Sequence, residues 1–167
     1  PDGVKVDGAH ILVPVRTLCQ ALGATVTWDD ATSTITIAAG SGPIASGDSF
    51  YNSTDLYWLS RIIYAESGNQ SLEGKIAVGN VVLNRVASSL FPNSVYTVIF
   101  QRNQFTPASS GSINREPSED AVIAAKLCLD GANTADNALY FVNPKVSPNS
   151  WASRNCTYVA TIGAHAF

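Results

Sequence analysis

Apolar residues recur at helical spacing early in the longer, second part of the chain. Leu59 and Ile63 follow Leu56 by three and seven residues, which places all three on one face of a helix. The preceding Ser53–Asp55 favours a helix N-cap with an acid in the first turn. At about 100° per residue, Glu66 falls on the same apolar face, within roughly 80° of arc. A carboxyl group there is either satisfied by an arginine or backbone amides, or kept protonated as a general acid requires.

The next segment, 71–86, is apolar almost all round, which predicts a buried central helix. Its polar positions Glu73, Asn80 and Asn84 share one narrow face. Glu73 lies in the expected first turn, where the helix dipole favours a carboxylate. The two asparagines must form hydrogen bonds if they are buried. They either tie the helix to neighbouring loops, or part of this face lines a groove beside Glu66.

The first 40 residues have a different pattern. Residues 11–13 are apolar, and 14–22 have helical spacing ahead of Gly23. Segments 25–28 and 34–37 alternate between polar and apolar side chains on either side of a turn. We therefore expect a strand, a helix and a β-hairpin, which together make a small βαββ module.

A stretch rich in glycine, serine and proline at 39–49 separates these two patterns. The charge changes at the same place, because residues 1–53 carry the whole net charge of −3 and the remainder is neutral. We therefore predict an N-terminal module at 1–40, a linker at 41–53 and a main domain at 54–167.

Composition narrows the functional classes. Hydrophobic residues make up 46% of the 167 residues and charged residues only 14%, so the chain can form a proper core under a largely uncharged polar surface. The net charge of −3 argues against nucleic acid as a partner, because phosphate binding needs a basic surface. No stretch reaches the roughly 18 apolar residues of a membrane span.

The few cysteines and histidines limit metal and thiol chemistry. Cys19, Cys128 and Cys156 lie too far apart for a zinc or redox motif, and their odd number excludes a complete disulfide framework. The only histidines, His10 and His165, supply too few ligands for a zinc site. We expect no metal and no other cofactor. Cys19, on an apolar helix face, is expected to be a small buried residue.

Several segments of the second part occur in the order found in one bacterial family. They read IIYAESGNQSLEGKIAVGNVVLNRV, FPNSVYTVIFQRNQFTPA, ALYFVNP and TIGAHAF, and they closely resemble the SleB/CwlJ family of cell-wall hydrolases over essentially all of 56–167. The resemblance implies an α+β fold with a mostly helical, lysozyme-like catalytic domain and a short sheet region. It also implies a lytic transglycosylase that acts on peptidoglycan between N-acetylmuramic acid and N-acetylglucosamine, with Glu66 as the catalytic acid.

The string VPVRTLCQALGATVTWDDATSTITI in the first module resembles the copper amine oxidase N-terminal-like domain, a stalk module of secreted Gram-positive proteins. The resemblance covers only the second half of that module, so its leading strands are expected to be missing. No set of copper ligands accompanies it. Together the two resemblances imply a protein secreted to the cell wall or spore cortex, with self-association through the incomplete module.

One position departs from the family pattern. Many relatives carry an acid four residues after the catalytic glutamate, where this chain has Gln70. Glycosidases usually need two carboxylates, but helix starts account for Glu73 and for Glu116 and Glu119. A mechanism with a single acid fits this small number of available carboxyl groups, because the muramic 6-hydroxyl can then serve as the nucleophile and give a 1,6-anhydro end.

Residues of the other family motifs are candidates for binding sugars, because aromatic faces stack on sugar rings and amides form paired hydrogen bonds. For each candidate, packing or turn capping is the competing interpretation. Alternation predicts a short strand over 140–143, so at most one of Tyr140 and Phe141 faces a groove. The substrate-binding candidates are Glu73, Gln104, Phe105, Tyr140 and Asn143.

Trp151 is either a platform for a sugar or a lid on the core, of which the core is favoured. His165 is expected to form structural hydrogen bonds instead of acting as a base. Three other functions stay open. A muramidase would use Glu66 and Glu73 as paired carboxylates. A thiol enzyme would pair Cys156 with His165 and cut the peptide stems. A non-catalytic module would bind peptidoglycan without cleaving it.

Overall fold

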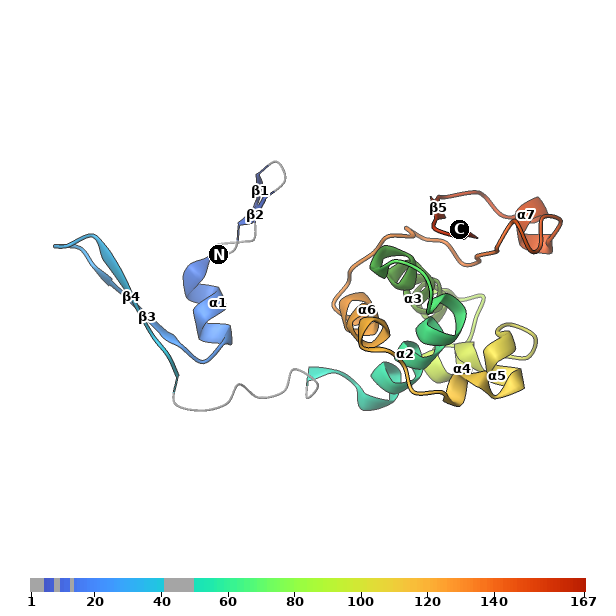
Figure 1. The fold of residues 1–167 in the computed structure, drawn as a ribbon, viewed down its shortest axis with the longest axis horizontal. Helices are drawn as coiled ribbons and strands as arrows, with labels where there is room; N and C mark the ends of the chain where they lie inside the picture. The colour runs from blue at the N-terminus through green and yellow to red at the C-terminus, as the bar shows by residue number, and fades with distance from the viewer. Residues whose placement is uncertain (1–4, 8–9, 13, 41–49) are drawn as a thin grey trace. The chain divides into compact units, whose positions relative to one another are not determined.

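The computed structural model describes residues 5–7, 10–12, 14–40 and 50–167. Contacts divide the chain into two compact units, Pro1–Gly47 and Asp48–Phe167, each with its own secondary structure (Figure 1). Residues 41–49 of the expected linker lie outside the described residues, as does Val13 of the expected first strand.

The first unit has two β-hairpins, one on each side of a short helix. β1 (Lys5–Asp7) pairs antiparallel with β2 (His10–Leu12), α1 (Val15–Ala21) follows, and β3 (Thr25–Asp29) pairs antiparallel with β4 (Thr34–Ala38). The predicted helix and second hairpin are confirmed. Two strands precede the helix where the sequence predicted one, because a three-residue strand is too short to show alternation.

Apolar side chains of the first unit lie largely at its surface. Val26 is the one buried hydrophobic residue among those described in this unit, whereas Leu18, Leu22 and Trp28 are each about half exposed. Cys19 is partly exposed, although the sequence predicted that it is buried. The described part of this unit therefore presents an apolar surface.

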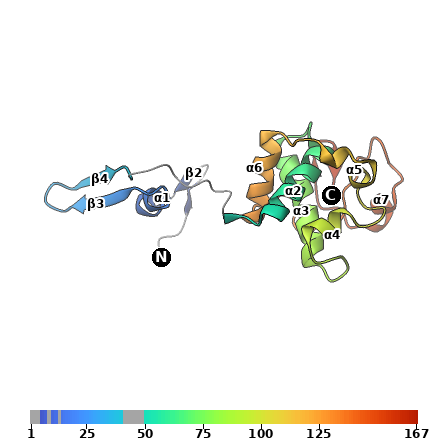
Figure 2. The ribbon, with the colours of Figure 1, turned by 90° about the horizontal axis from the view of Figure 1, so that it is seen from below.

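The second unit is mostly helical, and its three longest helices form its centre (Figures 1 and 2). Its elements are α2 (Ser53–Ser67), α3 (Leu72–Ala87), α4 (Val95–Ile99), α5 (Thr106–Ser110), the 3₁₀ helix η2 (Ser112–Asn114), α6 (Glu119–Leu129), α7 (Trp151–Asn155), β5 (Thr161–Ile162) and β6 (His165–Ala166). Helices α2, α3 and α6 pack against one another, and α4 and η2 contact α2. This arrangement confirms the predicted α+β class.

The cap of α2 differs from the sequence-based prediction. Asn52 is the N-cap, and its Oδ1 accepts hydrogen bonds from the N–H groups of Thr54 and Asp55 at 3.0 and 3.1 Å. Asn and Ser are equally good cap residues, so the sequence alone did not separate Asn52 from Ser53. Leu59 is fully buried, as the helical spacing predicted.

Helix α3 is the buried central helix that its sequence predicts. Ser71 is its N-cap and accepts a hydrogen bond from the Gly74 N–H at 3.3 Å. Gly79 lies where α3 meets its two neighbours. A β-carbon there would be 2.6 Å from Cys128 Sγ on α6 and 2.9 Å from Ile63 Cδ1 on α2. The three helices therefore approach one another more closely than any other residue at position 79 would allow.

The two asparagines of α3 hold the loop that follows α6. Asn80 donates a hydrogen bond to the Ala132 carbonyl at 2.7 Å and accepts one from the Thr134 N–H at 2.9 Å. Asn84 donates to the Ala138 carbonyl at 2.9 Å. Of the two interpretations left open by the sequence, the ties to loops describe both residues.

The C-terminal strands form a small sheet that contacts α3. β5 and β6 pair antiparallel, and Val142 adds a single bridge to β6. The strand predicted over 140–143 is reduced to this bridge, because Pro144 follows and cannot donate a ladder hydrogen bond. Phe141 packs against His165 and Phe167, with ring centroids 5.2 and 5.9 Å apart.

Candidate active site

Glu66 lies in the last turn of α2 and lines a cavity of about 380 Å³. The end of α2, the turn after it and the segment around η2 form the walls. Most of the lining side chains carry polar groups, so the cavity suits a hydrophilic ligand. The lining residues are Tyr64, Ala65, Glu66, Gly68, Asn69, Ser112 and Arg115.

The Glu66 carboxyl group is partly buried, and this burial raises its pKa above the usual value for glutamate. No hydrogen bond or ion pair reaches the group from any described residue. No arginine or backbone amide of a described residue is therefore bonded to the carboxylate to hold it ionised. What remains is a carboxyl group that keeps its proton to a higher pH than an exposed glutamate does.

Gln70 joins the turn after α2 to the C-terminal hairpin. Its Oε1 accepts a hydrogen bond from the Ala164 N–H at 2.9 Å, and its Nε2 donates one to Asn69 Oδ1 at 2.7 Å. The buried Lys75 donates from Nζ to the Gln70 carbonyl at 2.5 Å. The residue that departs from the family pattern is thus a structural tie, and it orients Asn69 at the cavity wall.

Glu73 is exposed in the first turn of α3 and does not line the Glu66 cavity. This is the position that the helix dipole favours. Of the carboxyl groups on described residues, Glu66 alone lines that cavity.

Arg115 is a wall residue that the sequence analysis missed. Its N–H donates to the Ser112 carbonyl at 3.3 Å, and the fully buried Ile113 anchors the short η2 helix between them. The sequence offers no signal for its role. A loop residue shows no periodicity, and its approach to α2 depends on tertiary packing.

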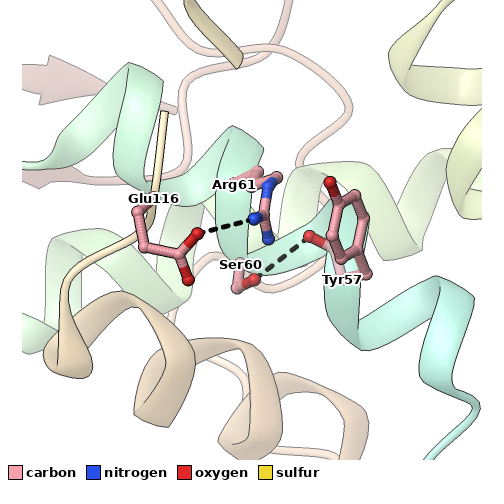
Figure 3. A network of polar contacts seen from close by, with 4 residues as sticks. All are labelled: Tyr57, Ser60, Arg61 and Glu116. Carbon is pink, nitrogen blue, oxygen red and sulfur yellow. Dashed lines mark hydrogen bonds and ion pairs between the residues drawn. The ribbon is translucent and has the colours of Figure 1, made fainter. Parts of the chain in front are cut away.

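The carboxylate next to Arg115 in the chain is directed to a different arginine (Figure 3). Glu116 Oε2 accepts a hydrogen bond from Arg61 Nη2 at 2.9 Å, and the Arg61 guanidinium lies over the Tyr57 ring, 3.7 Å from its centroid. The Ser60 hydroxyl donates to the Tyr57 carbonyl at 3.1 Å. Arg61 is buried on α2, so this ion pair holds the loop before α6 against that helix.

Three of the sugar-binding candidates meet around the buried side chain of Arg85, and none of them lines the Glu66 cavity. Arg85 donates from Nη1 to Gln104 Oε1 at 3.1 Å and from Nε to the Leu139 carbonyl at 2.7 Å. Its guanidinium lies 5.0 Å from the ring centroid of Phe105 and 5.1 Å from that of Tyr140. Burial lowers the pKa of Arg85.

Two of the candidates have structural positions. Phe105 is 5% exposed and belongs to the core, so its ring has no free face for a sugar. Asn143 shapes a turn, because its Oδ1 accepts a hydrogen bond from the Lys145 N–H at 3.0 Å. Packing accounts for Phe105 and turn capping for Asn143, which are the competing interpretations that the sequence left open.

Tyr140 and Trp151 form an aromatic pair with ring centroids 5.4 Å apart. Trp151 is 58% exposed, so the prediction that it covers the core is wrong. Tyr140 borders two cavities of about 240 and 370 Å³, which share Cys156, Thr157 and Phe167 as lining residues. Apolar side chains dominate both, in contrast to the Glu66 cavity.

His165 and Cys128 are buried in apolar surroundings. His165 is buried beside Phe141 and Phe167, and burial lowers its pKa. Its Nδ1 has no hydrogen-bond partner among the described residues, so the predicted hydrogen bond is not formed at that atom. Cys128 donates to the Ile76 carbonyl at 3.4 Å, and burial raises the pKa of its thiol to about 12, which excludes it as a nucleophile.

The described residues contain neither a metal-ligand cluster nor a membrane-spanning helix. All three cysteines are free thiols. No cluster of three or more histidine, cysteine or acidic side chains within the described ranges has the arrangement of a metal site. In the same part of the chain, no helix combines the length and the apolar character that crossing a bilayer requires.

Comparison with known proteins gives matches for both units. A family model described as Cell Wall Hydrolase matches residues 69–167, which begin after Glu66, and one described as Copper amine oxidase N-terminal domain matches residues 4–45. The spore cortex-lytic enzyme of Oceanobacillus iheyensis is 33% identical over 128 residues, 77% of this chain and 46% of that protein. That of Bacillus subtilis is 34% identical over 117 residues, 70% and 38% of the two proteins. The chain spans less than half the length of these relatives.

Solved structures show the same fold. The catalytic domain of the germination-specific lytic transglycosylase SleB from Bacillus anthracis has a TM-score of 0.65 and 34% identity, and the match covers 74% of this chain and 98% of that one. The catalytic domain of Bacillus cereus SleB has a TM-score of 0.65 and 35% identity, with 70% and 91% covered. These likenesses confirm the resemblance seen in the sequence motifs. The family model described as Cell Wall Hydrolase also matches more than half of the residues of this chain, and the chain therefore belongs to the cell wall hydrolase family.

Proposed function

We propose that the chain is a lytic transglycosylase that cleaves peptidoglycan between N-acetylmuramic acid and N-acetylglucosamine. The relatives named spore cortex-lytic enzyme and the SleB catalytic domains support this class of reaction. One observation carries the proposal for this chain: Glu66 is the one carboxyl group of the described residues in its cavity, and its pKa is raised. A carboxyl group that keeps its proton towards neutral pH suits a general acid.

Glu66 acts first as an acid and then as a base. Its proton goes to the glycosidic oxygen as the bond between that oxygen and muramic C1 breaks, and the N-acetylglucosamine side leaves as an alcohol. The Glu66 carboxylate then takes the proton of the muramic 6-hydroxyl, whose oxygen forms a bond to C1. Glu66 is thereby reprotonated, no water is consumed, and one strand ends in 1,6-anhydromuramic acid.

The position of Glu73 supports transglycosylation over hydrolysis. A hydrolase of the retaining or inverting type uses a second carboxylate about 5 to 9.5 Å from the first. Glu73 was the sequence candidate for that role, and it is exposed at the start of α3, outside the Glu66 cavity. The muramic 6-hydroxyl, which the substrate itself supplies, is then the nucleophile at hand.

Besides Phe105 and Asn143, the three other substrate-binding candidates keep solvent-exposed surface and are proposed as contacts for the glycan. They are Glu73, Gln104 and Tyr140. Gln104 has a free amide nitrogen once its Oε1 has accepted the hydrogen bond from Arg85. Tyr140 presents part of its ring beside the exposed Trp151.

Mass spectrometry of a peptidoglycan digest tests the proposed reaction. New muramic ends should lack the mass of one water and resist borohydride reduction, and a thiol blocker should leave the digestion unchanged. A digest with only reducible muramic ends would show a hydrolase and would make Glu73 the next residue to vary. Binding to peptidoglycan without any cleavage would show a non-catalytic module.

We also propose that the protein is secreted and acts on the cell wall or spore cortex of a Gram-positive bacterium, with residues 1–40 as a stalk, 41–53 as a linker and 54–167 as the catalytic domain. The named relatives and the match of residues 4–45 support this. The half-exposed Leu18, Leu22 and Trp28 support self-association through the first unit. Sedimentation of the chain and of a variant with Leu18→Ser and Leu22→Ser should show that these changes favour the monomer.

A further inference from the structure

One wall of the Glu66 cavity carries a positively charged side chain that no described carboxylate neutralises. Arg115 lines this cavity together with Glu66, and its guanidinium forms no hydrogen bond or ion pair with a described residue. Glu116, the acid next to it in the chain, is paired with Arg61 at 2.9 Å (Figure 3). The Arg115 side chain is therefore free for a ligand.

The backbone that carries Arg115 is held in place although its side chain is exposed. On one side, Gly111 precedes η2 as its N-cap with a φ of 79° that only glycine adopts readily, and the fully buried Ile113 anchors this short helix. On the other side, the exposed side chain of Glu116 forms an ion pair with the buried Arg61 of α2. A side chain presented by an ordered segment loses little backbone freedom when it binds a ligand.

The chemistry of the cavity favours an anion. While Glu66 holds its proton it is neutral, so the positive charge of Arg115 is the charge of the cavity. A guanidinium group binds a planar carboxylate through two parallel N–H···O hydrogen bonds. Asn69 and Ser112 add neutral hydrogen-bonding groups to the same walls.

We propose that Arg115 binds a carboxylate on the muramic side of the glycan strand, and so favours muramic residues that carry a free carboxylate over residues that do not. This rests on the proposed function of the Glu66 cavity. The sugar rings of the strand are uncharged, so the carboxylate belongs either to the peptide stem or, where muramic acid carries no stem, to its lactyl group. In both cases the contact places the muramic residue beside Glu66.

The test compares Arg115→Gln, which removes the charge, with Arg115→Lys, which keeps it, and with the matched control Arg154→Gln. Arg154 is exposed on α7 and lines none of the cavities described above. A charge-assisted hydrogen bond corresponds to about 10- to 100-fold in affinity. On strands that carry the contacted carboxylate we expect Arg115→Gln to raise KM by about that factor with little change in kcat, Arg115→Lys to raise it less, and Arg154→Gln to leave it unchanged.

Three substrates identify the carboxylate: strands with peptide stems, strands from which an amidase has removed the stems, and the same stripped strands with their lactyl carboxylates converted to methyl esters. An effect of Arg115→Gln on the first substrate alone assigns the contact to the stem, and an effect on the second alone assigns it to the lactyl group, whose carboxylate is free only after the stem has been removed. An effect on both shows that either carboxylate fills the same contact. The proposal is overturned if Arg115→Gln has no effect on any substrate, or if it impairs the esterified strands as much as the others.

A binding measurement separates this proposal from the proposed reaction. The change Arg115→Gln is added to Glu66→Gln, and the affinity of both proteins for short strands with and without free carboxylates is measured by calorimetry. The proposal requires weaker binding of carboxylate-bearing strands to the double variant, and equal affinities overturn it. If the wild type cleaves no strand, the proposed reaction fails, and this measurement still decides the role of Arg115.

Discussion

The Glu66 cavity and the surroundings of Arg85 both contain an arginine side chain, but only that of Arg85 has hydrogen-bond partners among the described residues. Around Arg85, the side chain of Gln104 and the carbonyl of Leu139 accept the guanidinium hydrogen bonds, and aromatic rings enclose the group. In the Glu66 cavity, neither the carboxyl group nor the guanidinium of Arg115 has a partner among the described residues. Polar groups with partners hold a fold together, whereas groups left without them are where chemistry and binding are expected.

Replacing Glu66 tests the role of the Glu66 cavity in this comparison and should have the largest effect. General acid–base catalysis is worth about 10²- to 10⁴-fold in rate, so Glu66→Gln should lower peptidoglycan cleavage by that factor. The melting temperature should not fall at neutral pH, because glutamine removes the cost of ionising a partly buried carboxyl group. Retention of more than about a tenth of the activity would mean that Glu66 is not the acid.

Truncating Phe105 tests the other region, the surroundings of Arg85, where side chains with partners hold the fold together. The ring lies in the core, so Phe105→Ala should lower the free energy of unfolding by about 3 to 5 kcal/mol. The exposed Trp151 is the matched control, and Trp151→Ala should change stability by no more than about 0.5 kcal/mol. Urea unfolding of both variants measures this. Equal losses would show that Trp151 is packed as the sequence predicted.

The pH dependence of cleavage sharpens the contrast, because it reports the state of Glu66 directly. The acid works while protonated, so activity should be present below its raised pKa and fall about tenfold per pH unit above it. Stability has the same sign, because a raised folded pKa favours the protonated native state and this contribution is lost as the pH rises through it. The residual activity of Glu66→Gln should lack this descending limb, and persistence of the limb would assign it to another group.

Gln70 joins the cavity to the rest of the fold, and its variants should have intermediate effects. Gln70→Ala loses the hydrogen bonds to Ala164 and Asn69 and should lower stability by about 1 to 2 kcal/mol. Gln70→Glu keeps the acceptor for the Ala164 N–H but cannot donate to Asn69. If the orientation of Asn69 matters, both variants should lower activity, while only the alanine variant should lose stability through the hairpin. Full activity in both would leave Asn69 without a role.

Removal of the first unit should have the smallest effect on the reaction. A chain that begins at Asp48 contains the whole second unit and the Glu66 cavity, so its kcat/KM on purified strands should match that of the full chain. Activity assays on soluble strands measure this. Insolubility of the shortened chain would show that the two units share a core.

Helical elements could be predicted from the sequence because their spacing is local. The face that carries Leu59 and Ile63 is buried, and Glu66 at its end is partly buried, as the periodicity required. The α3 asparagines were recognised as hydrogen-bonded positions, although only the structure shows that their partners are loop atoms.

Aromatic residues and loop residues could not be placed in this way. Phe105 is buried and Trp151 is exposed, which is the reverse of what the sequence favoured. An isolated ring in a short element carries no periodic signal, because its burial depends on which distant segments cover it. Arg115 was missed for the same reason, because it reaches Glu66 across a gap of 49 positions in the chain. The cavity is thus a product of tertiary packing, whereas its acid belongs to one helix.

The close contact at Gly79 has a consequence for engineering. Glycine-to-alanine changes are a common route to thermostable enzymes, because they reduce the freedom of the unfolded chain. At position 79 the added methyl group would meet both Cys128 Sγ and Ile63 Cδ1 at less than 3 Å, so these buried side chains or the helices that carry them would have to shift. Ile63 is one helical turn from Glu66, so the shift would reach the proposed acid. A stabilised version of this protein should therefore keep Gly79, although that residue is buried and lies outside the Glu66 cavity.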